Sequence, residues 1–352
     1  MKKIIATLVA LAAISTVAFA DEGLKVSGRV RAGITDTTEG SVYTTDAWMN
    51  GGYFGGATQL RVNVDYTKAF GGITARYNVN DFTNGKFFND GNVKWVMGYA
   101  NFADGQVITE AGIIHDRFTT TGGWEDAGID GGKGIRVVFA PKAVEGLTFA
   151  VQATDLFAEK YTATDDKVKD KKANAGDVIF NAKLIGATAK YETKEFFATA
   201  GFAVAGFFYG SVGVTAVDGL TFVAEVFHDN TDDTKAKPEN NDKAVTTICL
   251  WGEYTGIDQV LLGAYSYIYL NDGEYTAEVT PAVSFDLTKV VTLSAEASFY
   301  LSSVKDFDSY AVITPAVTFK ASDKASANVS ASISTDKDQE KHSITAGVLY
   351  KF

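Results

Sequence analysis

The most constraining feature of this sequence is an alternation of apolar and polar residues with a period of two, which recurs from residue 24 to the end. In residues 24–34 the even positions are apolar or Gly, and the odd positions include Lys25, Arg29 and Arg31. Successive side chains of a strand point to opposite faces, so the pattern predicts strands with one apolar and one polar face. The same alternation is clear in residues 60–67, 73–80, 291–299 and 325–334.

The connections between these segments alternate in length. Short connections such as 68–71, 142–146, 286–289 and 322–324 are interleaved with long polar ones at residues 35–56, 80–92, 115–132, 157–176 and 229–242. We predict 18 strands, which begin near residues 24, 57, 72, 93, 105, 133, 146, 177, 195, 210, 219, 243, 259, 274, 290, 309, 325 and 342. Residues 196–214 are apolar or small on both faces, and an error there would leave 16 strands.

The polar face carries too much charge for the dry core of a soluble sandwich, because burying charge without a partner is costly. Its charged residues include Arg29, Arg31, Arg61, Arg76, Arg136, Glu225, Glu278 and Glu296. A closed barrel with water inside and lipid outside removes that cost, and it pairs every backbone group. We therefore predict an all-β fold, a transmembrane antiparallel β-barrel with long external loops and short periplasmic turns.

The N-terminal segment has the features of an export signal. Lys2 and Lys3 precede an apolar run over residues 4–17, and Ala18 and Ala20 form a small-x-small cleavage site. We predict that residues 1–20 are a cleaved signal peptide and that residues 21–352 form one barrel domain. Loss of the two lysines would change the net charge from −11 to −13. So acidic a chain is a poor partner for nucleic acid, whose binding relies on Lys and Arg.

The last predicted strand, residues 342–352, places Val348, Tyr350 and Phe352 on one face. This ending resembles the C-terminal signal that the outer-membrane barrel-assembly machinery reads. Together with the export signal and the alternation, it makes the chain resemble the general bacterial porin family over nearly its full mature length. The resemblance implies an outer-membrane location, contact with membrane lipid and a homotrimer, with lipopolysaccharide as a further candidate partner.

All six arginines precede residue 137, and five of them lie on the polar face of predicted strands, namely Arg29, Arg31, Arg61, Arg76 and Arg136. The third long loop, 115–132, contains the acids Glu125, Asp126 and Asp130. In porins the third loop folds into the lumen opposite a basic wall, so the resemblance implies a constriction between the two groups. Two alternatives stay open: the arginines only hydrate the inner wall, or they form a dedicated ligand site.

Three tyrosines, Tyr265, Tyr267 and Tyr269, share one face of a predicted strand. They suit an aromatic girdle at a membrane interface, a contact between protomers, or a sugar-stacking track. A track would need aromatic residues that continue on neighbouring strands, so we expect the girdle or the protomer contact.

No motif indicates catalysis. His115, His228 and His342 lack zinc-ligand spacing and an identifiable partner nucleophile, and Cys249 has no base nearby in sequence. We therefore expect no enzyme activity, no metal and no cofactor. The expected function is passive diffusion of small polar solutes through a water-filled lumen. The alternatives are a structural or adhesive barrel whose loops plug the lumen, and a substrate-specific channel.

Overall fold

The computed structural model describes residues 23–37, 40–42, 60–79, 93–114, 132–154, 157–159, 178–180, 185–204, 207–229, 245–271, 273–304, 307–336 and 342–352. The predicted cleavage residues Ala18 and Ala20 lie outside these ranges, as do Glu125, Asp126 and Asp130 of the third long loop. Within the described ranges, no helix is long and apolar enough to cross a membrane.

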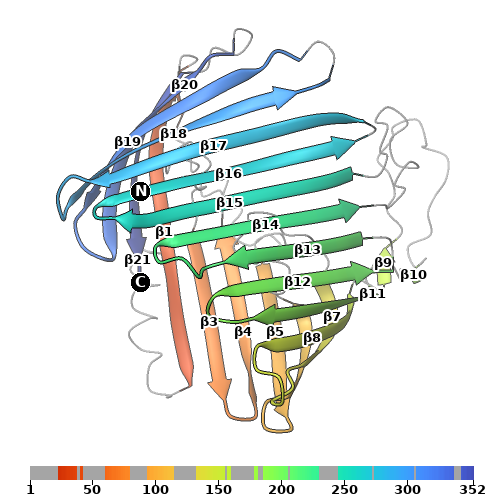
Figure 1. Cartoon of the computed structure of the whole chain (residues 1–352). Helices are drawn as coiled ribbons and strands as arrows, with labels where there is room; N and C mark the ends of the chain where they lie inside the picture. The colour runs from red at the N-terminus through yellow and green to blue at the C-terminus, as the bar shows by residue number, and fades with distance from the viewer. Residues whose placement is uncertain are drawn as a thin grey trace, which may run out of the picture.

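Eighteen antiparallel strands form a closed barrel (Figure 1). They are β1 (Leu24–Thr37), β3 (Leu60–Lys68), β4 (Gly71–Val79), β5 (Val93–Phe102), β6 (Val107–Ile114), β7 (Gly132–Phe139), β8 (Leu147–Thr154), β11 (Ile185–Glu192), β12 (Phe196–Ala203), β13 (Phe207–Val214), β14 (Leu220–Asp229), β15 (Val245–Ile257), β16 (Val260–Asn271), β17 (Glu274–Asp286), β18 (Val291–Ser302), β19 (Tyr310–Lys320), β20 (Ala325–Ser334) and β21 (Ser343–Lys351). The predicted fold class and the count of 18 are confirmed.

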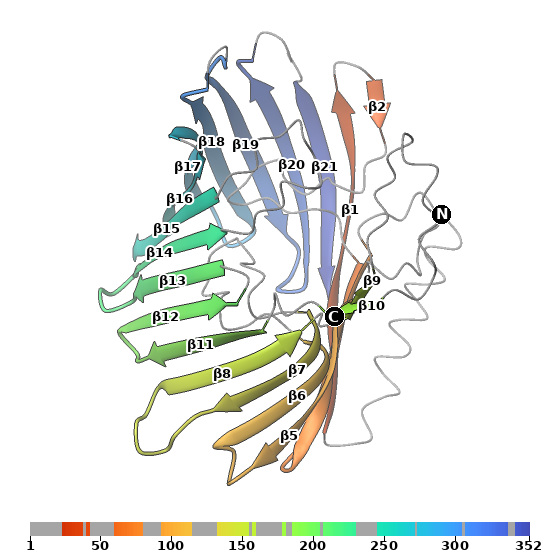
Figure 2. The ribbon, with the colours of Figure 1, turned by 90° about the vertical axis from the view of Figure 1, so that its right-hand side faces the viewer.

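The barrel closes where the last strand meets the first. Each strand pairs with the next one along the chain, and β21 pairs with β1 from Arg29↔Lys351 to Thr37↔Ser343 (Figure 2). Phe352, directly after the end of β21, exchanges two backbone hydrogen bonds with Gly28 of β1, each 3.0 Å long. The first and last strands therefore form a seam that leaves neither of them as an open edge.

Three short strands add to this barrel or lie apart from it. β2 (Gly40–Val42) pairs with the end of β1. β9 (Phe157–Glu159) and β10 (Val178–Phe180) form a separate two-stranded ribbon. The predicted barrel strand near residue 177 is therefore wrong, because the strand that pairs with β8 begins at Ile185.

The two-residue period divides the side chains between two surfaces. Apolar side chains cover the outer face, where Ile135 and Val151 are each 58% exposed and Ile344 is 61% exposed. Polar side chains on the same strands, such as Arg136 and Gln152, point inward and are buried. The β-branched and aromatic residues of the outer face also favour the extended backbone. An outer surface this apolar is suited to hydrocarbon.

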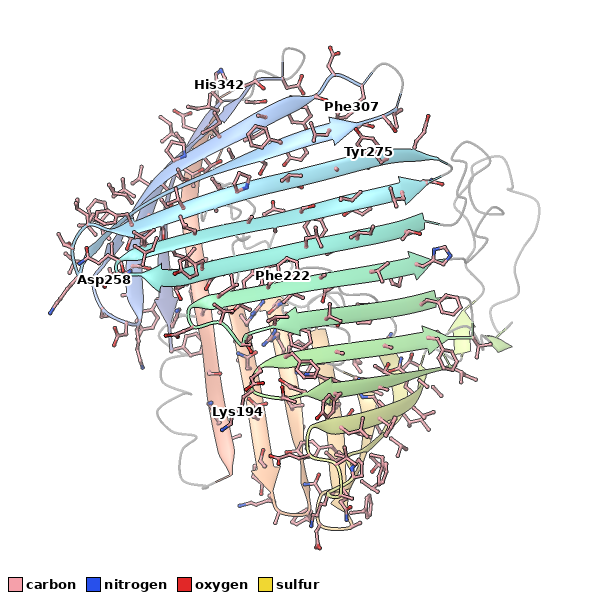
Figure 3. All side chains as sticks on the ribbon, in the orientation of Figure 1. Lys194, Phe222, Asp258, Tyr275, Phe307 and His342 are labelled. Carbon is pink, nitrogen blue, oxygen red and sulfur yellow. The ribbon has the colours of Figure 1, made fainter. Side chains whose placement is uncertain are left out.

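The two ends of the barrel differ. At one end the connections are tight, as at 69–70, 193–195, 258–259 and 321–324, and Lys194 and Asp258 lie on two of them (Figure 3). Tyr275 lies at the opposite end, where most connections are long (Figure 3). The predicted division into tight turns and long loops is confirmed, except that 204–206 and 272–273 are short connections at the long-loop end.

Exposed aromatic rings gather on the outer face next to the tight turns. They are Phe102, Phe139, Tyr191, Phe196, Phe222, Phe285, Phe319 and Tyr350. Each lies within the last or first three residues of its strand. A band of aromatic rings at one level of the barrel matches the girdle of membrane barrels, where such rings lie at the interface between lipid and water.

Candidate functional site: the inner wall

The strand register brings four arginines together on the inner face. Arg29 of β1 lies directly opposite Arg61 of β3, and Arg61 lies opposite Asn78 of β4. Arg31 is two residues beyond Arg29 on the same face, and Arg76 of β4 lies opposite Asn63. We call Arg29, Arg31, Arg61 and Arg76 the basic sector. Their predicted inward direction agrees with this register.

Neutral amides hold two of these guanidinium groups in place. Arg61 Nε donates a hydrogen bond to Asn78 Oδ1 at 3.2 Å, and Arg76 Nε donates to Asn63 Oδ1 at 2.7 Å. The guanidinium carbon of Arg76 also lies 3.9 Å from the centroid of the Trp95 ring. A stacked guanidinium with an amide partner has a fixed direction and keeps its full positive charge. Arg61 and Arg76 thus present oriented positive charge to the interior.

Arg136, the fifth predicted arginine, has different surroundings. It lies on the inner face of β7, where its Nε donates a hydrogen bond to Glu110 Oε2 of β6 at 2.5 Å. The two side chains are 0% and 1% exposed. Its charge is therefore neutralised within the wall, three strands away from the basic sector. The sequence had predicted that Arg136 belongs to the same basic wall as the other four arginines.

The side of the barrel opposite the basic sector carries carboxylates on its strands. Glu225 of β14, Glu253 of β15, Glu278 of β17 and Glu296 of β18 share the inner face. In the ring of 18 strands, β14 is nine positions from β3, so Glu225 and Arg61 come from diametrically opposite strands. We call these four carboxylates the acidic sector. Sequence reasoning placed three of them on the polar face but assigned the acidic side of the lumen to the third long loop.

Tyr265, Tyr267 and Tyr269 lie on the inner face of β16, in the same rows as Thr280, Glu278 and Thr276 of β17. Leu262 and Leu270 occupy the outer face of this strand, and both are exposed. The expected girdle or protomer contact is therefore wrong for these three tyrosines. Aromatic residues continue on the neighbouring inner face, at Trp251 of β15, Tyr300 of β18 and Tyr310 of β19.

Hydroxyl and amide groups dominate the inner face of the last strands, between the acidic and basic sectors. Thr314, Asn328, Ser330 and Thr345 are all buried there. Asn328 Nδ2 donates a hydrogen bond to Thr318 Oγ1 at 2.9 Å. Apart from Lys320 and Lys351 next to the tight turns, this part of the described wall is polar without charge, so the inner surface changes around its circumference from basic to acidic to largely neutral.

The remaining candidate residues are placed as follows. Val348 and Tyr350 project from the outer face of β21 and are 57% and 50% exposed, while the Phe352 ring covers Gly28. Cys249 is a buried cysteine on the inner face of β15 and is not in a disulfide. Within the described ranges, no group of three or more His, Cys, Asp or Glu residues could hold a metal ion.

Neither a protein-family model nor a curated protein matches this sequence. Solved structures do match in fold. A loop-deletion mutant of OmpT, an outer membrane protein of Vibrio cholerae, is similar with a TM-score of 0.55 and 12% identity, over 94% of this chain and 100% of that one. The trimer form of in-vitro folded OmpT from Vibrio cholerae is similar with a TM-score of 0.50 and 14% identity, over 94% of this chain and 100% of that one.

The anion-selective porin from Comamonas acidovorans is similar with a TM-score of 0.53 and 11% identity, over 94% of this chain and 99% of that one. At such low identity, the likeness shows the fold alone. The chain therefore has the porin-type β-barrel fold, in agreement with the architecture that the sequence pattern predicts.

Proposed function

We propose that this protein is an outer-membrane porin through which small polar solutes diffuse passively. The observation that supports it most is the division of the barrel into an apolar, exposed outer face and a charged inner face. A water-filled interior accommodates a charged inner face, and a hydrocarbon surround suits an apolar outer face. No cofactor, metal or chemical step is part of this function.

The charge distribution supports a transverse field across the lumen. Arg61 of the basic sector on β3 and Glu225 of the acidic sector on β14 come from opposite strands. Fixed charges of opposite sign orient dipolar solutes and disfavour apolar ones, which cannot replace ordered water. We propose that Glu125, Asp126 and Asp130 of the loop 115–132 add negative charge to this field and narrow the passage.

Export, assembly and partners are part of the same proposal. Residues 1–20 would direct export, and Val348, Tyr350 and Phe352 would be read by the barrel-assembly machinery. The aromatic band next to the tight turns supports contact with membrane lipid. Lipopolysaccharide would be a further partner, at the end with the long loops. A similar fold is known in a trimer form, which supports a homotrimer here.

One observation favours a second candidate, a structural or adhesive barrel with a filled interior. Several polar side chains of the inner wall are almost fully buried, including Thr154 at 0%, Thr280 at 0% and Glu296 at 2%. A wide lumen open to water would leave such side chains accessible. A narrow or filled interior therefore remains the main competitor of the diffusion pore.

Conductance of the full chain in planar lipid bilayers separates the two candidates. Folding is first verified by the heat-dependent shift in electrophoretic mobility that closed barrels give. Stable, high-conductance steps from the folded protein are the expected result. A folded barrel that inserts into the bilayer and gives no steps would overturn the pore and support the filled barrel.

A further inference from the structure

A carboxylate on the inner wall lies between tyrosines of both neighbouring strands. In the register, Tyr267 of β16 is opposite Glu278 of β17, Glu278 is opposite Tyr300 of β18, and Tyr300 is opposite Tyr310 of β19. These four side chains form one row across the sheet. Their sequence positions span more than 40 residues, and the pairing of β16 to β19 brings them together.

The hydrogen bonds in this row use one oxygen of Glu278 and leave the other available. Oε1 accepts hydrogen bonds from Tyr265 Oη at 2.5 Å, from Tyr300 Oη at 3.3 Å and from Thr280 Oγ1 at 3.4 Å. Oε2 accepts none from the described part of the chain. Glu278 is half-buried, so this second oxygen is held in a fixed direction beside the rings and can be reached from the interior.

The rings around Glu278 form two groups of neighbouring rings, one on each side of it. Along β16, the ring centroids of Tyr265 and Tyr267 are 5.5 Å apart, and those of Tyr267 and Tyr269 are 6.4 Å apart with nearly parallel planes. On the other side of Glu278, the rings of Tyr300 and Tyr310 stack with centroids 4.6 Å apart. Unlike the fully buried groups of the wall, Tyr269 is 39% exposed. A ligand in the interior could therefore contact ring faces on both sides of the carboxylate.

The charge of this wall selects the kind of ligand. Strands β15 to β18 contain no Lys or Arg, but they contain five acids, Glu253, Glu274, Glu278, Asp286 and Glu296. Aromatic faces attract cations through the negative face of the ring, most strongly where water is partly excluded. A carboxylate beside such faces adds direct charge attraction.

We propose that the row formed by Tyr267, Glu278, Tyr300 and Tyr310, together with Tyr265 and Tyr269, is a binding site for organic ammonium cations. The hydroxyl groups of Tyr265 and Tyr300 already donate hydrogen bonds to Glu278, so the site offers a ligand ring faces and a negatively charged oxygen. A methylated ammonium group matches both. A sugar would in addition need donors for its ring and hydroxyl oxygens. The site deepens the proposed function and rests on it, because a solute would reach this row through the pore.

Binding is measured with the detergent-solubilised full chain and tetramethylammonium chloride, by isothermal titration calorimetry. The unchanged protein should bind the cation. E278Q should weaken binding about 10-fold or more, since it removes the charge and keeps the size of the side chain. Y267L should weaken binding about 3-fold or more, whereas Y267F, which retains the ring, should bind within about 2-fold of the unchanged protein.

Two matched controls remove the same groups elsewhere. D258N removes a carboxylate from an exposed turn, and Y275L removes an exposed outer-face tyrosine from β17 itself. Both should bind as the unchanged protein does, and all variants are compared only after the heat-dependent mobility shift shows that they are folded. Equal binding to E278Q and to the unchanged protein would overturn the site. The proposed site would also be refuted if tetramethylammonium does not bind, but maltohexaose binds tightly and Y267L abolishes that binding.

Bilayer recordings separate failure of the site from failure of the pore. If the barrel conducts, tetramethylammonium should reduce the current of the unchanged protein at lower concentration than that of E278Q. If it does not conduct but binds the cation in detergent with the expected variant order, the pore proposal fails and the binding site stands. If it conducts without any binding or block that depends on Glu278, the site is refuted and the pore stands.

Discussion

Glu110 and Arg136 lie opposite each other on β6 and β7 and form an ion pair of 2.5 Å whose side chains are withdrawn from solvent. Removing one partner leaves the other charge buried, which costs roughly 3–5 kcal/mol for such pairs. We expect R136M and E110Q alone to be strongly destabilised. The double variant should recover most of the loss, as measured by urea unfolding in detergent followed by tyrosine and tryptophan fluorescence. Additive losses in the double variant would show that the pair is not coupled.

The basic sector should control ion selectivity. If the ion path runs about 10 Å from Arg61 and Arg76, each charge changes the energy of a passing ion by about 0.4 kcal/mol in water, or roughly 2-fold in permeability. Replacing both with Ala should therefore shift the reversal potential toward cation preference in a KCl gradient at low ionic strength. K142A, which removes one positive charge from an exposed turn, is the control. An unchanged reversal potential in the double variant would exclude a role for this sector in selectivity.

Closure of the barrel should depend on Gly28. A Cβ at this position would lie 2.2 Å from the backbone oxygen of Arg61 and 2.5 Å from Cζ of the Phe352 ring. The contact with Arg61 cannot relax without shifting β1 against β3, and the contact with Phe352 lies at the seam, so G28A should cost about 1–3 kcal/mol and reduce the yield of folded barrel. Gly98 provides the control, because the nearest atom to its added Cβ is 3.9 Å away. The folded fraction is read from the heat-dependent mobility shift, and equal yields of G28A and G98A would contradict this account.

The outer face should tolerate charge only near the ends of the strands. Val151 is exposed within β8, far from the tight turn, whereas Leu287 is exposed in the turn after β17. An arginine at the middle of the hydrocarbon costs about 2–4 kcal/mol, and near the interface about 0–1. V151R should thus lower stability in lipid vesicles, and L287R should not. If V151R is as stable as L287R, the outer face does not contact hydrocarbon.

The architecture of this barrel is largely readable from one sequence because its period is strict. The predicted starts at residues 93, 274 and 325 are the first residues of β5, β17 and β20. The inward direction of Arg29 and Arg61 follows from the alternation alone, because β1 and β3 each have one clearly apolar face. Whether a residue holds an odd or an even position along its strand determines its face, and this needs no knowledge of the partner strand.

Features that depend on the partner strand were not predictable in the same way. The pairing of Glu110 with Arg136, and of Glu278 with Tyr265, requires the register between strands, which the composition of each strand does not specify. The inner face of β16 was misread for a further reason. A tyrosine has an apolar ring and a polar tip, so it is compatible with lipid and with water, and its face cannot be inferred from polarity.

The seam between β1 and β21 has a consequence for biogenesis. Because β21 pairs with β1, the ring is incomplete until residues 343–351 have joined the sheet. Every earlier intermediate has two rows of amides with no neighbour, and such edges pair readily with other chains. Before the ring closes, such an intermediate must therefore be kept apart from other unfolded copies, and a chain that lacks β21 should aggregate rather than form a barrel.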